Sequence, residues 1–347
     1  MYKKLGALAI TIIMLMQIAI PCNIFADNET ESEPNLVVCE VLMEVSTKTI
    51  LNSVNPDKKV SVGTMAKLMT VLLTAEAIEN GIITLETEVK ASTYANSMQG
   101  AQIWLMPGEK MTIMELLKGV IIGNANDASV VLAETISLTE DTFVKQMNKR
   151  ASELGMSSTT FTNCNGYYDD NKQVSTASDM AILLAELYRY ENLTEIFTTW
   201  HDYIRNGETE LVNANTLVRT YDGIKGFKAG YTDYTGYFTA IGASRENGDY
   251  VAVVIGCDDK DYSFTEAKRL LNYGFTGFQK FKPLLSDDIP NSIAIRGGVE
   301  KQVPIIIDNF DEIIIPNGTS KSVTSRVILP DYVYAPTKKG QVIGEIQ

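Results

Sequence analysis

The stretch Ser61-Val62-Gly63-Thr64-Met65-Ala66-Lys67-Leu68-Met69-Thr70 opens a helix on which the rest of this chain can be organised. Apolar residues recur at the helical spacing i, i+3, i+4 and i+7 and predict a buried helix ending near Gly81: Leu68, Val71, Leu72 and Ala75. Thr64 then lies in the first turn, with Lys67 one turn later on the same face. A hydroxyl at the positive end of a helix, beside an amine whose pKa burial has lowered, can act as a nucleophile. An ordinary helix cap followed by a solvated lysine is the alternative interpretation.

The first residues have the layout of an export signal. Lys3 and Lys4 precede an apolar run from Leu5 to Ile20, and Ile24-Phe25-Ala26 precedes a polar segment. This pattern predicts a signal peptide over residues 1–26, cleaved after Ala26, and hence a protein at the extracytoplasmic face or cell wall. The protein is then either secreted or anchored by a retained signal segment, and only the second case gives membrane contact.

Charge, cysteine and histidine content exclude several function classes. The net charge of −13 argues against nucleic acid or an anionic membrane as the partner. Cys39, Cys164 and Cys257 remain after cleavage, an odd number without CxxC spacing, which indicates neither a disulfide framework nor a zinc site. His201 is the single histidine, so a multi-histidine metal site is excluded. We expect no metal or other cofactor, and acid–base chemistry that relies on lysine or carboxylates.

The 347 residues suffice for a large core and a smaller domain. Residue patterns predict a strand at 35–45 with a hairpin partner at 48–51, and a second hairpin of 236–244 and 249–257. They also predict a helix opened by the capping box Thr112–Glu115 and helices at 143–154 and from Thr176. A last helix is predicted to be capped at Ser263–Glu266 and to end at Gly274. From Phe281 onward the helical period is lost, and short β-branched runs alternate with turns. We therefore predict a main domain at 27–280 and a small all-β domain at 281–347.

Three polar clusters stand in order along the main domain: Thr64-x-x-Lys67, Asn124-Ala125-Asn126 and Lys228-Ala229-Gly230. Their order resembles the S-x-x-K, S-x-N and K-T-G motifs of the penicillin-recognising serine hydrolases. The flanking segments are similar to those of the low-molecular-weight penicillin-binding proteins of the D-alanyl-D-alanine carboxypeptidase family: Lys67-Leu68-Met69-Thr70, Trp104-Leu105-x-Pro107-Gly108-Glu109, Asn163-x-Asn165-Gly166, Ser175-Thr176-Ala177-x-Asp179-Met180 and Gly230-Tyr231-Thr232.

The resemblance implies a fold and a role for each motif residue. It implies an α/β (α+β) three-layer fold of the penicillin-binding/β-lactamase type, with an antiparallel sheet between helices and a small C-terminal all-β domain. Thr64 stands where the family has its acylated serine, and Lys67 stands at the general base. Asn124 and Asn126 fall on the second motif, which relays protons and orients substrate. Lys228, Ala229 and Gly230 fall on the third motif, which holds the terminal carboxylate of the substrate and borders the oxyanion hole.

All three motifs depart from the family pattern. Thr64 keeps the hydroxyl but adds a methyl group that stiffens χ1 and crowds the acyl carbon. Asn124 replaces a serine and is a poor proton relay. Ala229 removes a donor to a charged carboxylate, worth roughly 1.5–3 kcal/mol. Gln173 stands where many relatives have a histidine.

These departures leave three hypotheses open. The first is an enzyme that removes the terminal D-alanine of peptidoglycan stem peptides through an acyl-threonine ester, with β-lactams as covalent ligands. The second is a weak or inactive family member that binds peptidoglycan or a partner. The third is another chemistry on the same fold, such as that of a β-lactamase or esterase. For the enzyme we expect a buried Lys67 with a lowered pKa, within hydrogen-bond distance of the Thr64 hydroxyl.

Overall fold

The computed structural model describes residues 37–167, 172–282, 290–307 and 313–346. The predicted signal peptide, residues 1–26, therefore lies outside the described residues. Within them, no helix is long and apolar enough to span a membrane.

A five-stranded antiparallel sheet is the centre of the main domain, in the order β2-β1-β11-β10-β9. Its strands are β1 Cys39–Glu44, β2 Ile50–Val54, β9 Ile224–Thr232, β10 Gly236–Arg245 and β11 Gly248–Cys257. Both predicted hairpins are confirmed, because β1 pairs with β2 and β10 pairs with β11 around Asn247-Gly248. Strand β9 pairs only with β10 among the described strands, so its other edge is free of sheet partners.

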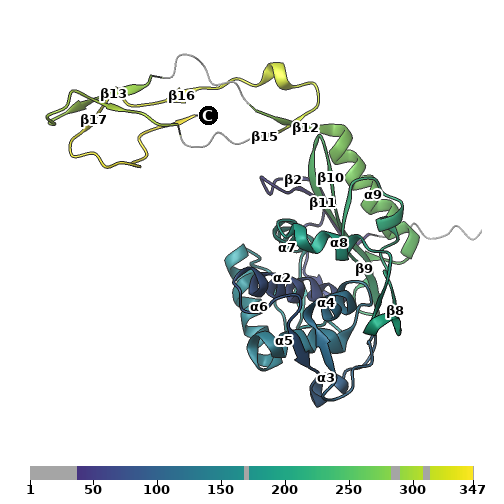
Figure 1. Cartoon of the computed structure of the whole chain (residues 1–347). Coiled ribbons are helices and arrows are strands. Elements are labelled where there is room, and N and C mark those ends of the chain that lie inside the picture. Colours follow the sequence, from purple (N-terminus) through teal and green to yellow (C-terminus); the bar gives the residue numbers. More distant parts are fainter. Residues whose placement is uncertain (1–36, 168–171, 283–289, 308–312, 347) are drawn as a thin grey trace, which may run out of the picture. The chain divides into compact units, whose positions relative to one another are not determined.

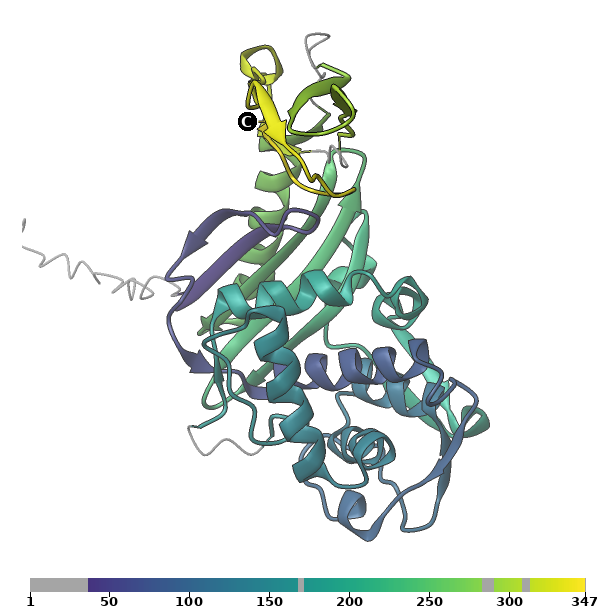
Figure 2. The same cartoon turned by 90° about the vertical axis from the view of Figure 1, so that its left-hand side faces the viewer.

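Helices cover both faces of this sheet, as Figures 1 and 2 show, and the predicted three-layer fold is confirmed. The helices are α2 Ala66–Glu79, α3 Thr93–Asn96, α4 Ile113–Ile121, α5 Asn126–Ser137, α6 Glu140–Leu154, α7 Ala177–Leu187, α8 Thr194–Thr198 and α9 Lys260–Gly277. Successive side chains along a strand point to opposite faces of the sheet, so the hydrophobic core is divided into two clusters. Val41 and Val253 face the cluster that contains α2 and α7, whereas Leu42 and Val254 face α9.

The predicted start and end of the last helix were wrong. Helix α9 begins at Lys260, because the side chain of Asp259 accepts a hydrogen bond from the Tyr262 N–H and caps it. The helix also continues past Gly274 to Gly277. Ser263 lies inside the helix instead, where its hydroxyl is 2.9 Å from that of Thr239 on β10. The Asp259 cap, four residues before Ser263, thus overrode the Ser-x-x-Glu pattern.

Short pairs of strands complete the main domain. They are β3 Val60–Ser61 with β6 Val174–Ser175, β4 Glu88–Lys90 with β5 Lys110–Thr112, and β7 His201–Ile204 with β8 Thr209–Val212. His201 is exposed and pairs with Glu210 across the last of these hairpins, a surface role.

The C-terminal part forms small sheets, as predicted for an all-β domain. Strand β12 (Phe278–Phe281) pairs with β15 (Ile313–Pro316), β13 (Ser292–Arg296) lies between β14 (Gln302–Pro304) and β17 (Tyr332–Tyr334), and β16 (Val327–Ile328) pairs with β18 (Glu345–Ile346). The boundary predicted at residues 280 and 281 stays a prediction, and β12 already belongs with the C-terminal strands by its pairing.

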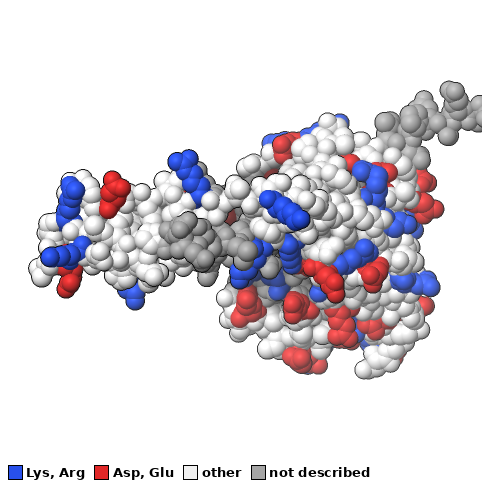
Figure 3. Space-filling view, turned by 90° about the horizontal axis from the view of Figure 1, so that it is seen from above, with Lys and Arg blue, Asp and Glu red and all other residues white. Residues whose placement is uncertain are grey.

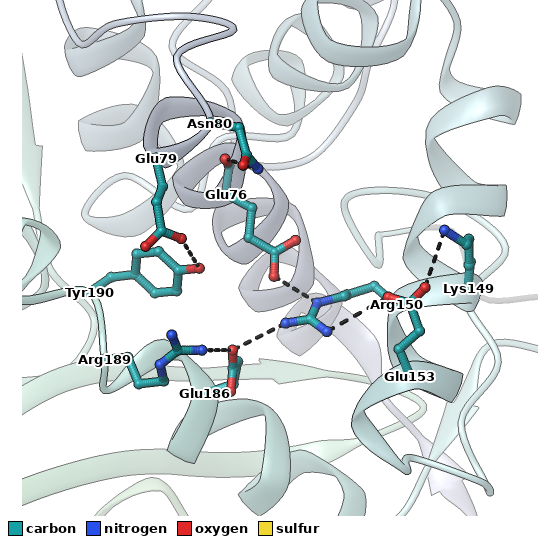
Figure 4. Close-up of polar contacts among 9 residues, drawn as sticks. All are labelled: Glu76, Glu79, Asn80, Lys149, Arg150, Glu153, Glu186, Arg189 and Tyr190. Carbon is teal, nitrogen blue, oxygen red and sulfur yellow. Dashed lines mark hydrogen bonds and ion pairs between the residues drawn. The ribbon is translucent and has the colours of Figure 1, made fainter. Parts of the chain in front are cut away.

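An ion-pair network ties the far end of α2 to α6 and α7 (Figure 4). Arg150 on α6 is at its centre and contacts Glu76 on α2 at 2.6 Å and Glu186 on α7 at 3.1 Å. Because Glu186 is buried, with 7% of its side chain exposed, these contacts are screened less than those of an exposed pair. The network thus joins three helices of the main domain at the C-terminal end of α2.

Candidate active site

Thr64 lies in a 3₁₀ turn, η1 (Gly63–Met65), that leads directly into α2. Gly63 and Gly166 allow this turn to be approached closely from two sides. A Cβ atom at Gly63 would lie 2.4 Å from the Thr235 hydroxyl, and one at Gly166 would lie 1.8 Å from the Gly63 carbonyl oxygen. Both glycines also have positive φ, 49° and 73°. The backbone around Thr64 is therefore enclosed by the β9–β10 turn and by the loop that contains Gly166.

The Lys67 side chain is buried and held by two hydrogen bonds. Only 1% of it is exposed, and its amine donates to the side-chain oxygen of Asn126 at 2.6 Å and to the main-chain oxygen of Asn165 at 2.7 Å. Burial, with a smaller contribution from the nearby cation Lys228, holds the pKa of Lys67 well below its usual range. A neutral amine has two N–H groups, both of which these two acceptors engage, and its lone pair stays available as a base.

The predicted hydrogen bond between Lys67 and Thr64 was wrong. The Thr64 hydroxyl is buried and has no hydrogen-bond partner among the described residues. The amine is instead directed to Asn126 and Asn165. The expected burial and lowered pKa of Lys67 are both present.

Asn124 and Asn126 enter the site from the turn before α5. Asn126 is the first residue of α5 and also donates through its amide to the Gln99 carbonyl at 2.5 Å. Asn124 has φ of 57°, a left-handed conformation that asparagine tolerates better than most residues. Its side-chain oxygen is buried and, like the Thr64 hydroxyl, has no partner among the described residues. Orphaned buried oxygens are uncommon, and two at one site favour a place where a ligand binds.

Strand β9 supplies the third cluster, and its residues point to different faces. Lys228 is 5% exposed, and burial lowers its pKa to about 7. Gly230 faces Thr64: a Cβ atom there would lie 3.4 Å from the Thr64 hydroxyl oxygen. Ala229 pairs across the sheet with Thr239 and packs in the core cluster on the α9 side. Lys228 and Gly230 thus join Thr64 and Lys67, whereas the Ala229 side chain lies on the opposite face of the sheet.

Thr64, Asn124 and Asn126 line one open cleft of about 870 Å³. The cleft is also lined by Ala101, Thr162, Asn163, Tyr167, Tyr231, Thr232, Asp233 and Tyr234. Lys67 and Lys228 do not line this cleft. They line a separate and otherwise apolar cavity of about 10 Å³, together with Phe197 and Phe227. Among the described residues no cluster of histidine, cysteine and carboxylates could hold a metal ion.

Sequence reasoning missed Asn165, whose contribution is a main-chain oxygen. A carbonyl group has no residue-type signal, but its loop does: Asn163 accepts hydrogen bonds from the Asn165 and Gly166 N–H groups at 3.2 and 2.6 Å. Gln173 supports the same loop by accepting from the Thr162 and Asn163 N–H groups at 2.8 and 2.9 Å. The Asn163-x-Asn165-Gly166 segment is thus the sequence signal from which the Asn165 acceptor could have been predicted.

Comparison with known proteins identifies the family. The sequence profile of D-alanyl-D-alanine carboxypeptidase matches residues 29–259, and that of the penicillin-binding protein 5 C-terminal domain matches residues 278–347. The chain belongs to the D-alanyl-D-alanine carboxypeptidase family. It is 34% identical to the D-alanyl-D-alanine carboxypeptidase DacF of Bacillus subtilis (strain 168), over 88% of this chain and 79% of that protein.

Solved structures of this family share the fold. Penicillin-binding protein 5 from Haemophilus influenzae superposes with a TM-score of 0.81 at 30% identity, over 89% of this chain and 91% of that one. Penicillin-binding protein D2 from Listeria monocytogenes in its cefotaxime-bound form gives a TM-score of 0.60 at 25% identity, over 70% of this chain and 100% of that one. The family is thus one of penicillin-recognising serine hydrolases.

Proposed function

We propose that this protein removes the terminal D-alanine from peptidoglycan stem peptides through an acyl ester on Thr64. The observation that supports it most is the state of Lys67. A buried amine with a lowered pKa, whose N–H groups are both engaged, has its lone pair left to take a proton. The Thr64 hydroxyl, without a partner of its own, stands in the preceding turn of the same helix.

The proposed reaction assigns one role to each motif residue. Lys67 takes the proton of the Thr64 hydroxyl as its oxygen bonds to the carbonyl carbon of the penultimate D-alanine. The C–N bond then breaks, and the terminal D-alanine leaves with that proton on its amine. Water hydrolyses the ester and restores the hydroxyl group.

The other motif residues position the substrate in this proposal. The Lys228 cation binds the terminal carboxylate, and Gly230 leaves room for the tetrahedral carbon beside Thr64. Asn126 holds Lys67, and the unpartnered oxygen of Asn124 accepts from a substrate amide. Ala229 contributes backbone alone, since its methyl group packs on the α9 side.

Binding without turnover is the second candidate, and one observation favours it. Lys67 makes no hydrogen bond to the Thr64 hydroxyl, so this hydrogen bond must form on substrate binding before the proton can be transferred. A weak or inactive member would still bind stem peptides in the same cleft.

We further propose that the protein works at the extracytoplasmic face, secreted or held by its signal segment, and that β-lactams acylate Thr64. The cefotaxime-bound Listeria relative supports the second point. Figure 3 shows both acidic and basic side chains on the face in view.

Release of D-alanine from Nα,Nε-diacetyl-L-lysyl-D-alanyl-D-alanine tests the proposal. The wild type should release D-alanine, Lys67→Ala should not, and Lys145→Ala, which removes an exposed lysine on α6, should match the wild type. Tight binding of the peptide without any release of D-alanine would instead support the binding protein.

A further inference from the structure

The turn between β9 and β10 carries the one carboxylate that lines the active-site cleft within the described parts of the chain. This turn, Thr232-Asp233-Tyr234-Thr235, directly follows the third motif. Asp233 lines the cleft together with Thr64. A carboxylate in the wall of a substrate cleft can select the charge of what binds there.

The position of this carboxylate is well defined. The Thr232 hydroxyl accepts a hydrogen bond from the Thr235 N–H at 3.0 Å and donates to the Thr235 hydroxyl at 2.7 Å, which closes the turn. Thr235 in turn packs against Gly63, the residue before Thr64, where no side chain would fit. The turn that carries Asp233 is thus packed against the residue that precedes Thr64.

The surroundings of Asp233 suit a cation. Tyr231 donates its hydroxyl to the Asp233 carboxylate at 3.1 Å, and none of the ion pairs among the described residues involves Asp233. Three half-exposed tyrosines line the same cleft: Tyr167, Tyr231 and Tyr234, with exposed fractions of 39%, 52% and 59%. A carboxylate among aromatic rings is a common way to bind an ammonium group.

The direction of β9 indicates which part of a substrate reaches this turn. Its outer edge has no strand partner among the described residues, so an extended peptide can pair along it. With the terminal carboxylate at Lys228 and the scissile carbonyl at Thr64 beside Gly230, the upstream residues run toward Thr232. From Gly230 to Asp233 is three residues, about 10 Å, which a long side chain on the next residue upstream can span.

We propose that Asp233, flanked by Tyr231 and Tyr234, binds a side-chain ammonium on the residue that precedes the terminal D-alanyl-D-alanine. The inference rests on the proposed function, which sets the direction of the peptide. It means that the protein selects stem peptides whose side-chain amine is free over those in which the amine has been acylated and has lost its charge.

Two probes that differ only in this charge test the proposal: Nα-acetyl-L-lysyl-D-alanyl-D-alanine and its Nε-acetylated form. For each we would measure kcat/KM for D-alanine release and Kd by calorimetry, in the wild type, Asp233→Asn and Glu246→Gln. Glu246 is an exposed carboxylate on the β10–β11 turn and serves as the matched control.

The wild type and Glu246→Gln should favour the free amine about five-fold, the size of one partly exposed cation contact, and the preference should shrink in 0.5 M salt. Asp233→Asn should lose this preference, so that the ratio of its constants for the two probes approaches one. Equal constants for the two probes in the wild type, or no binding of either, would overturn the inference. If neither probe releases D-alanine but the Kd preference is present and depends on Asp233, the inference stands and the proposed hydrolysis fails.

Discussion

The two buried lysines of the candidate active site differ in what surrounds them. Lys67, on the helical wall, donates to two protein oxygens. Lys228, on the strand wall, forms no hydrogen bond or ion pair within the described parts of the chain, and burial alone accounts for its pKa of about 7. A base must be held neutral and oriented before the substrate arrives, whereas a carboxylate-binding cation must keep its donors for the ligand. The same residue type thus serves two functions through its partners.

The largest expected effect is at the helical wall. Lys67→Ala removes the proposed base, and general-base catalysis typically contributes about 10²–10⁴ in rate. Covalent labelling by a fluorescent penicillin should therefore fall to background. Labelling of Lys67→Ala at a tenth of the wild-type rate or more would show that another group takes the Thr64 proton.

Lys228→Gln should have a smaller effect, because it removes a charged contact and leaves the base in place. One charge-assisted hydrogen bond is worth roughly 1.5–3 kcal/mol, or about 10–100-fold in the second-order labelling rate. The wild-type cation is lost as pH rises through about 7, so part of the wild-type rate should decline above that pH. The Lys228→Gln profile should lack this decline, and an identical pH profile in both proteins would contradict the role.

The same lysine should make folding stability depend on pH. Its pKa falls from 10.5 in an exposed lysine to about 7 in the folded protein. Between these values the unfolded chain binds more protons, so this lysine makes stability rise with pH across that window. Lys228→Met should be more stable than the wild type at pH 7, with a gap that closes toward pH 10. Urea unfolding midpoints at the two pH values measure this.

Thr64→Ser keeps the hydroxyl and removes the methyl group that restricts χ1. Relief of a rotamer penalty of about 0.5–1.5 kcal/mol corresponds to acylation up to about ten-fold faster. Stopped-flow labelling with a reporter β-lactam measures the rate. A slower serine variant would indicate that the threonine methyl group positions the hydroxyl.

The smallest effect is expected at Ala229. A threonine there should change labelling less than about three-fold, because the side chain lies on the α9 face, across from Lys228. A hydrogen-bond donor directed at developing negative charge usually raises a rate by about 10²-fold or more. A gain of this size in the labelling rate would show that the added hydroxyl reaches the cleft. It would also show that weak substrate binding limits the rate of the wild type.

Residue patterns predicted much of this molecule, and the reasons for the misses are specific. The helix after Thr64, the Thr112–Glu115 capping box and the Asn247-Gly248 hairpin all follow from local signals. The start of α9 was missed because Asp259 is the stronger cap.

The site was harder to predict than the fold. Motif order gave Lys67, Asn126 and Gly230, which the fold brings together around Thr64. The motifs could not predict the role of the Asn165 carbonyl, because a main-chain oxygen is present at every residue. They also could not predict which way the Lys67 amine points, because this depends on the positions of the Asn126 and Asn165 oxygens in the folded protein. The face on which Ala229 lies depends on the register of β9 with β10, which no local pattern encodes.

The central claim is that Lys67 activates Thr64 as a nucleophile. It is tested most directly by peptide mass spectrometry after incubation with penicillin, in the wild type, Lys67→Ala and the triple variant Thr64→Ser, Asn124→Ser, Ala229→Thr. We predict one penicilloyl adduct on the peptide that contains Thr64, a faster adduct in the triple variant, and none in Lys67→Ala. If the triple variant folds normally and still forms no adduct at residue 64, the scaffold no longer supports acylation and the protein is a binding member of the family.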